Sequence, residues 1–182
     1  MTVAETLAKL KSAKGIEPSA TYKGIEEADD FILAIQTEST QTKKSDWIVC
    51  ADHVKEHSGA LNATTTDDTF IRTGPVTSKG STQRTLAVNG NRCVGDAFQD
   101  FVLSHKIKYG SGNDVQVPYI YFSIRTGKGE AGNAVLIVTS DVGGTAGNAA
   151  TFALDVKAVG TPDEFDYLTE TQSAAPAKSV KA

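Results

Sequence analysis

The chain has 182 residues, of which 40% are hydrophobic and 22% are charged, a composition typical of one globular domain with an ordinary core. The formal net charge of −4 argues against nucleic-acid binding by attraction to phosphates, and the longest apolar run, 134–138, is too short to cross a membrane. Residues 1–15 lack the continuous apolar stretch of a secretory signal, so we expect synthesis in the cytoplasm and no membrane partner.

Residues 1–29 are predicted to form an N-terminal arm that precedes the main domain. Within this arm, Val3, Leu7 and Leu10 recur at helical spacing before Gly15. This spacing favours a short amphipathic helix over residues 2–14, and a mobile arm is the alternative.

From residue 30 onward the apolar pattern changes to period two, which is typical of strands. Residues 55–68 interrupt it, because they are polar and rich in Thr, Asn and Asp. Since this stretch is long for a connector, we predict a projecting loop there. The glycines and proline of 74–80 predict a turn. The strands predicted around these segments are 30–37, 46–54, 68–73 and 81–90.

One amphipathic helix is predicted at 96–107, with Asp96 as its N-cap and Gly110 as its stop. The side chains that share its apolar face are Ala97, Phe98, Phe101, Val102 and His105. Because His105 lies on this stripe, we interpret it as a residue at the boundary of the core rather than as a catalytic base.

Three strands follow the helix, at 115–125, 134–140 and 151–159, and the last is predicted to end at a Gly-Thr-Pro turn, 160–162. The glycines of 127–132 match G-x-G-x-x-G, but a strand rather than a helix follows them, so we interpret them as a hairpin turn. Residues 169–182 lack apolar periodicity and are predicted to be a flexible tail. The economical architecture is a mostly antiparallel sheet with one covering helix.

The sequence predicts no catalytic, metal or cofactor site. Cys50, His53 and His57 have spacings that a zinc site could use, but on a strand Cys50 and His53 point to opposite faces. No nucleophile, base and acid occur in a recognisable catalytic arrangement, and no pair of carboxylates stands out.

The order of elements over residues 68–165 resembles that of the major tail tube proteins of long-tailed, siphovirus-type bacteriophages. The likeness lies in the helix segment GDAFQDFVLSHKI, the hairpin AVLIVTSDVGGTAGNAATFALDVKAVG and the Gly-Thr-Pro after it. The resemblance implies a mainly β fold: a sandwich- or barrel-like domain over residues 30–168, with one flanking helix and a long projecting loop.

The resemblance also implies a structural virion protein whose six subunits form a ring, with the rings stacked helically into the tail tube. The implied partners are further copies of the chain, the tape measure protein, the tail terminator and distal tail proteins, and DNA in transient, non-specific passage to the host. Asp141 and Asp155 are candidates for acids that line the lumen and repel DNA. The loop at 55–68 would reach the adjacent ring through Lys55, Glu56, His57, Ser58, Leu61, Asn62, Thr64, Asp67 and Asp68.

Other functions remain open at this point. A capsid decoration protein or a tail-completion protein would also use a small β domain. A monomeric carbohydrate-binding β-sandwich would need a surface cluster of aromatic residues, for which Trp47, Tyr119 and Tyr121 are the candidates. A hydrolase would have to use His53 or His57 with a nearby acid.

Overall fold

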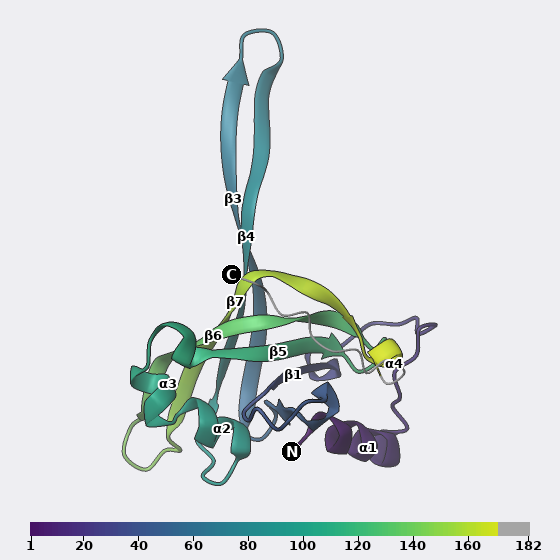
Figure 1. Ribbon diagram of the computed structural model, residues 1–182, viewed down its shortest axis with the longest axis vertical. Coiled ribbons are helices and arrows are strands. Elements are labelled where there is room, and N and C mark those ends of the chain that lie inside the picture. Colours follow the sequence, from purple (N-terminus) through teal and green to yellow (C-terminus); the bar gives the residue numbers. More distant parts are fainter. Residues whose placement is uncertain (171–182) are drawn as a thin grey trace.

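The structure is a computed structural model that describes residues 1–170 (Figure 1). Its strands form one antiparallel sheet of seven strands in the order β2-β1-β5-β6-β7-β4-β3, which confirms the mainly β fold. The strands are β1 (Phe31–Ile35), β2 (Ile48–Val49), β3 (Val54–Phe70), β4 (Gly74–Asn91), β5 (Gln116–Ser123), β6 (Lys128–Gly143) and β7 (Thr151–Asp166). The helices are α1 (Val3–Lys14), α2 (Ala97–Val102), α3 (His105–Tyr109) and α4 (Tyr167–Glu170), with 3-10 turns at Ala28–Asp30, Lys44–Asp46 and Gly112–Val115.

The main core lies on one face of the sheet, under α2 and α3. Alternate residues of β7 point into it, because successive side chains of a strand lie on opposite faces. Strands β1, β4, β5 and β6 contribute in the same way. The strands change direction across the sheet, from β5 and β6 to β3 and β4 (Figure 1). The largest fully buried side chains of this core are Leu33, Ile35, Leu86, Phe98, Tyr119, Leu136, Phe152 and Leu154.

A second core covers the opposite face of β1 and β5, and α1 packs on it. Val3 and Leu7 of this helix are buried against Ile120 and Phe122 in the same cluster. The helix begins at a capping box in which Thr2 and Glu5 exchange side-chain hydrogen bonds, and it ends at the left-handed Gly15. Of the two alternatives for residues 2–14, the structure therefore has the helix.

The helix predicted at 96–107 is divided in two. Asp96 caps α2 as predicted, by accepting from the Gln99 amide at 2.9 Å, and Gly110 ends α3. Between them the backbone at Ser104 is extended, and this break turns α3 so that Ile107 faces the core. The prediction that His105 shares the apolar face and lies at the boundary of the core is therefore wrong, because its side chain is exposed.

Residues 55–68 project from the domain as predicted, but as half of a long β-hairpin rather than as an irregular loop (Figure 1). The β3–β4 ladder runs from the Val54–Gly90 pair to the Phe70–Gly74 pair, and the turn lies at residues 71–73 instead of 74–80. Gly74 has a φ of 75°, the left-handed conformation that closes a three-residue hairpin turn. The outer part of the hairpin, residues 64–81, stands away from the core and shows no alternation between buried and exposed positions, whereas the inner part of β4 buries Leu86 and Val88 in the main core.

Two further predictions of strand boundaries are wrong. Strand β6 begins at Lys128, inside the segment interpreted as a turn, because Gly129 lets the backbone of β5 approach closely. Strand β7 does not stop at the Gly-Thr-Pro sequence but continues to Asp166. Residues 160–162 form an outward bulge between the Asn133–Val159 and Ala131–Asp163 pairs, and Gly160 takes a positive φ there.

Most of the predicted C-terminal tail lies outside the described residues. Its first two residues, Thr169 and Glu170, belong to α4. Within residues 1–170, none of the helices combines the length and the apolar character needed to span a membrane.

Candidate assembly surfaces

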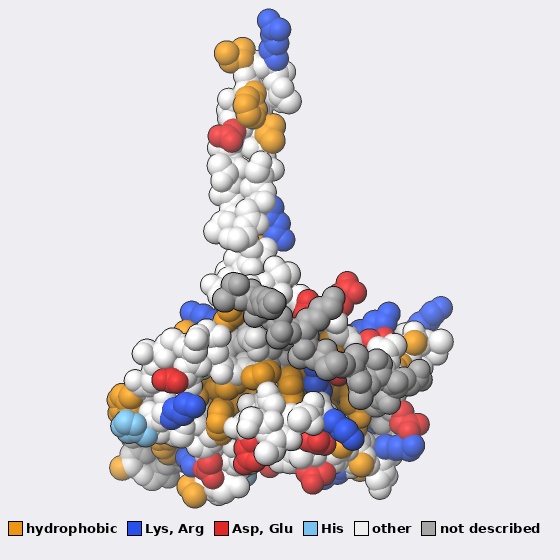
Figure 2. Space-filling model, in the orientation of Figure 1, with side chains coloured by type: hydrophobic (Ala, Val, Ile, Leu, Met, Phe, Trp, Pro, Cys, Tyr) orange, Lys and Arg blue, Asp and Glu red, His pale blue; other side chains and the backbone are white. Residues whose placement is uncertain are grey.

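The outer part of the β3–β4 hairpin, residues 64–81, is exposed apart from the half-buried Gly74. Among the residues predicted to contact an adjacent ring, only His57 is half-buried, and the others are exposed. Figure 2 shows the hairpin as a largely uncharged column with hydrophobic side chains near its tip. The large exposed apolar residues of the hairpin are Leu61, Phe70, Ile71 and Val76, and Ile71 is fully exposed. Exposed apolar side chains on a projecting element are typical of a protein–protein contact.

The hairpin also presents unpaired backbone edges. Strand β3 is the last strand of the sheet, and β4 pairs with β7 only from Thr85 onward. Both edges of the hairpin are therefore free over residues 64–81 within the described part of the chain. Free edges of this length are ready to pair with another strand or to be covered by a partner.

At the root of the hairpin, an ion pair joins β4 to β6. The Arg84 Nε of β4 donates to the Glu130 Oε1 of β6 at 2.6 Å, although these two strands are not neighbours in the sheet. Both side chains are largely buried. The Tyr119 hydroxyl lies 3.3 Å from the same carboxylate oxygen, and burial beside Glu130 raises the pKa of Tyr119. These contacts attach the hairpin to the body of the domain.

His57 and Gly59 lie on the same side of the hairpin root as Arg84. The guanidinium of Arg84 covers Gly59 so closely that a Cβ there would lie 2.6 Å from the arginine Nη1. The guanidinium also stacks over the Tyr121 ring at 5.3 Å, and the His57 ring meets the same tyrosine edge-on at 5.8 Å. Burial lowers the pKa of His57, because low-dielectric surroundings disfavour the charged ring.

Asp155 lies on the face of β6 and β7 that points away from the main core. We call Val135, Ile137, Asp155, Lys157 and Val159 the open face. All of them except Asp155 line a shallow groove, in which Ile137 and Val159 are exposed. The carboxylate of Asp155 lies 3.7 Å from the Lys157 ammonium. The open face is therefore mostly apolar, and a lysine accompanies the predicted acid.

Asp141, the other acid predicted to line a lumen, lies near the far end of β6. Its carboxylate pairs with the Lys108 Nζ of α3 at 2.6 Å. Hydrogen bonds from Lys108 and from the Val142 amide lower the pKa of Asp141. Each of the two acids thus has a lysine partner of its own, and they do not form one joint acidic patch.

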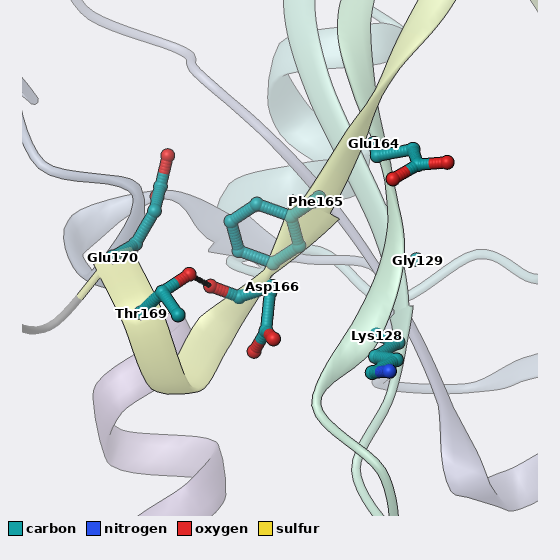
Figure 3. Close-up of a pocket in the computed structure, with 7 residues that line it drawn as sticks. All are labelled: Lys128, Gly129, Glu164, Phe165, Asp166, Thr169 and Glu170. Atoms are coloured by element: carbon teal, nitrogen blue, oxygen red, sulfur yellow. Dashed lines mark hydrogen bonds between the residues drawn. The ribbon is translucent and has the colours of Figure 1, made fainter. Parts of the chain in front are cut away.

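A depression between β6 and the end of β7 lacks the arrangement of a catalytic site. Figure 3 shows Phe165 between Glu164 and Lys128 on one side and Thr169 and Glu170 on the other, so the polar groups do not converge. The Thr169 hydroxyl donates to the Asp166 carbonyl at 3.0 Å.

Other candidate chemistry is also dispersed. Among residues 1–170 no three His, Cys, Asp or Glu side chains are grouped to hold a metal ion. Cys50 is buried, and burial raises the pKa of its thiol. Two of the aromatic residues considered for carbohydrate binding, Trp47 and Tyr119, are buried in the cores and offer no surface platform.

Sequence reasoning missed the residues that hold the hairpin and α2 in place. Arg84 and Glu130 are 46 positions apart and meet only because the sheet curves. Gln99 is completely buried, and its side chain donates to the backbone carbonyls of Asp52 and Asn91. The only sequence signal for Gln99 was its place on a helix whose neighbouring residues are apolar.

No protein-family model and no curated protein matches the sequence. Solved structures do match: the SPP1 tail tube superposes with a TM-score of 0.58 at 15% identity, covering 80% of this chain and 84% of that one. The chain has a tail tube fold. A structure of the tail of an empty gene transfer agent particle, determined with C6 symmetry, gives a TM-score of 0.53 at 16% identity and covers 76% and 98% of the two chains. A chain from the virion of the native gene transfer agent particle gives 0.50 at 16% identity, with 77% and 98% covered.

At these identities the matches define the fold and not the roles of individual residues. The antiparallel sheet with its packed helices superposes on most of the length of the matched tail chains, and this supports the assignment of the fold.

Proposed function

We propose that this chain is the structural subunit of a tail tube and is located in the tail of a virion. Copies of the chain would form hexameric rings that stack helically into a conduit for DNA. The observation that carries the proposal is the long hairpin with free edges and an apolar tip, on a fold shared with tail tube structures. The C6 symmetry of the gene transfer agent tail supports six subunits per ring.

In this arrangement the role of the chain is structural rather than enzymatic, and the hairpin serves as the contact between rings. Leu61, Phe70, Ile71 and Val76 would be covered by a subunit of the next ring, which would remove apolar area from water. Free strand edges would find their hydrogen-bond partners in neighbouring copies. The tape measure protein would occupy the tube before ejection, and the terminator and distal tail proteins would bind its ends.

Electron microscopy of the concentrated protein tests the proposal. We expect tubes of uniform bore for the natural chain. The matched variant Phe70→Ser/Ile71→Ser should remain folded, because both side chains are exposed, but should form shorter tubes or none. As a control, Val94→Ser changes an exposed apolar residue away from the hairpin and should leave the tubes intact. A natural chain that stays monomeric at every concentration would contradict the proposal.

A further inference from the structure

The root of the hairpin contains a titratable side chain that the assembly role does not explain. His57 lies on β3, opposite Val88 of β4, and its ring contacts Tyr121 of β5. Tyr121 also stacks on Phe31 of β1 at a centroid distance of 5.5 Å. The His57 ring therefore lies where the projecting hairpin meets the body of the domain.

The His57 ring is held in a form that suits the neutral state. Its Nδ1 is buried and has no hydrogen-bond partner among the described residues. A neutral ring can leave this nitrogen unprotonated, whereas a charged ring carries a proton on both nitrogens. Protonation would therefore place a charge on a half-buried ring; a hydrogen bond with the backbone of His57 itself favours the charged form, but burial outweighs it.

The charged groups around the ring offer little compensation for a proton. Arg84 of β4 already places one cation on this side of the hairpin, over the Tyr121 ring. Glu130 of β6 is engaged by Arg84 and by Tyr119. Asp29, in the 3-10 turn Ala28–Asp30, attracts the charged ring, but burial outweighs it in setting the pKa of His57.

We propose that His57 is a pH-sensitive joint at the root of the hairpin, and that protonating its ring frees the hairpin to change its angle to the body. Because the folded chain has the lower pKa, the neutral ring is the form that it favours. The contact between the His57 and Tyr121 rings is complete at pH values above 6.5, the ordinary pKa of histidine, and it is lost as the pH falls below that value. We call the arrangement in which the hairpin has changed its angle the open arrangement. For each unit by which the pKa of His57 is lowered, protonation shifts the equilibrium toward the open arrangement about tenfold.

The hairpin angle can be measured by pulsed electron resonance between spin labels at Ser78→Cys and Asn113→Cys, in a Cys93→Ser background; both labelled positions are exposed. Cys50 is buried and stays unlabelled. We expect a narrow distance distribution at about pH 8 that broadens at about pH 5, the range in which histidine titrates. His57→Phe keeps a ring against Tyr121 but cannot titrate, so its distribution should be narrow at both pH values.

The exposed His105, which lies 4.8 Å from the Tyr109 ring, provides the matched control. His105→Gln should keep the broadening at low pH, and loss of the broadening in this variant would overturn the proposal. A natural chain with the same distribution at both pH values would also overturn it, as would equal broadening in His57→Phe. These measurements use the unassembled chain, so a failure to form tubes would count against the proposed function and not against the joint.

Discussion

Single side chains fix the hairpin root, and Arg84 is the most consequential of them. Replacing it in Arg84→Met leaves the largely buried Glu130 without its cation, so we expect the free energy of unfolding to fall by about 1–3 kcal/mol. Gly59→Ala should cost part of the same energy, because its Cβ displaces the guanidinium. Urea unfolding of both variants and of the double variant checks this. If the losses in the free energy of unfolding of the two single variants add in the double variant, the two residues act independently. The contact of Arg84 with Gly59 would then not be the source of the stabilisation.

Gln99 holds α2 to two other segments. Its amide donates to the carbonyls of Asp52 and Asn91, and its Oε1 accepts from the Cys93 amide at 2.7 Å. Gln99→Met keeps the volume but leaves these backbone groups without partners, so we expect a loss of about 2–4 kcal/mol in the free energy of unfolding. Thermal unfolding followed by circular dichroism measures it. The exposed Gln116 provides the control, and Gln116→Met should change little.

At the scale of elements, the outer hairpin and the body are separable. Residues 64–81 are exposed apart from the half-buried Gly74, so they contribute little to the core. Replacing them with Asn-Gly, a two-residue turn, would join the paired residues Ala63 and Thr82. We expect the melting temperature to change by less than about 2–4 °C, while tube formation is lost. Tubes of normal length from this variant, seen by electron microscopy, would show that the hairpin is not the contact between rings.

The strands differ in how well the sequence predicts them. Strands β1 and β5 were predicted nearly correctly, because their buried residues alternate or run continuously through two cores. Residues 55–68 of the hairpin were mistaken for a loop, since a ladder exposed on both faces has no apolar period. Its many threonines were the available signal, because β-branched residues favour strands.

At the scale of the whole molecule, the chain carries a net charge of −4, but the open face pairs Asp155 with Lys157. If this face lines the tube, Asp155→Asn would leave an uncompensated lysine there in every copy. We expect DNA to bind more strongly to assembled tubes of this variant than to natural tubes, measured by co-sedimentation at low salt. Asp141→Asn, which frees Lys108 in the same way, tests the second acid. If neither variant changes DNA retention, the two acids do not line the lumen.

The sequence by itself determined the class of the fold, the capped start of α2 and the presence of a projecting segment, because these depend on local periodicity and capping. Only the tertiary structure decided that the projection is a hairpin, that α1 covers a second core, and that Arg84, Glu130 and His57 gather at one root. The physical reason is that these features depend on which strands pair and how far the sheet curves, and contacts between distant residues leave no local pattern in the chain.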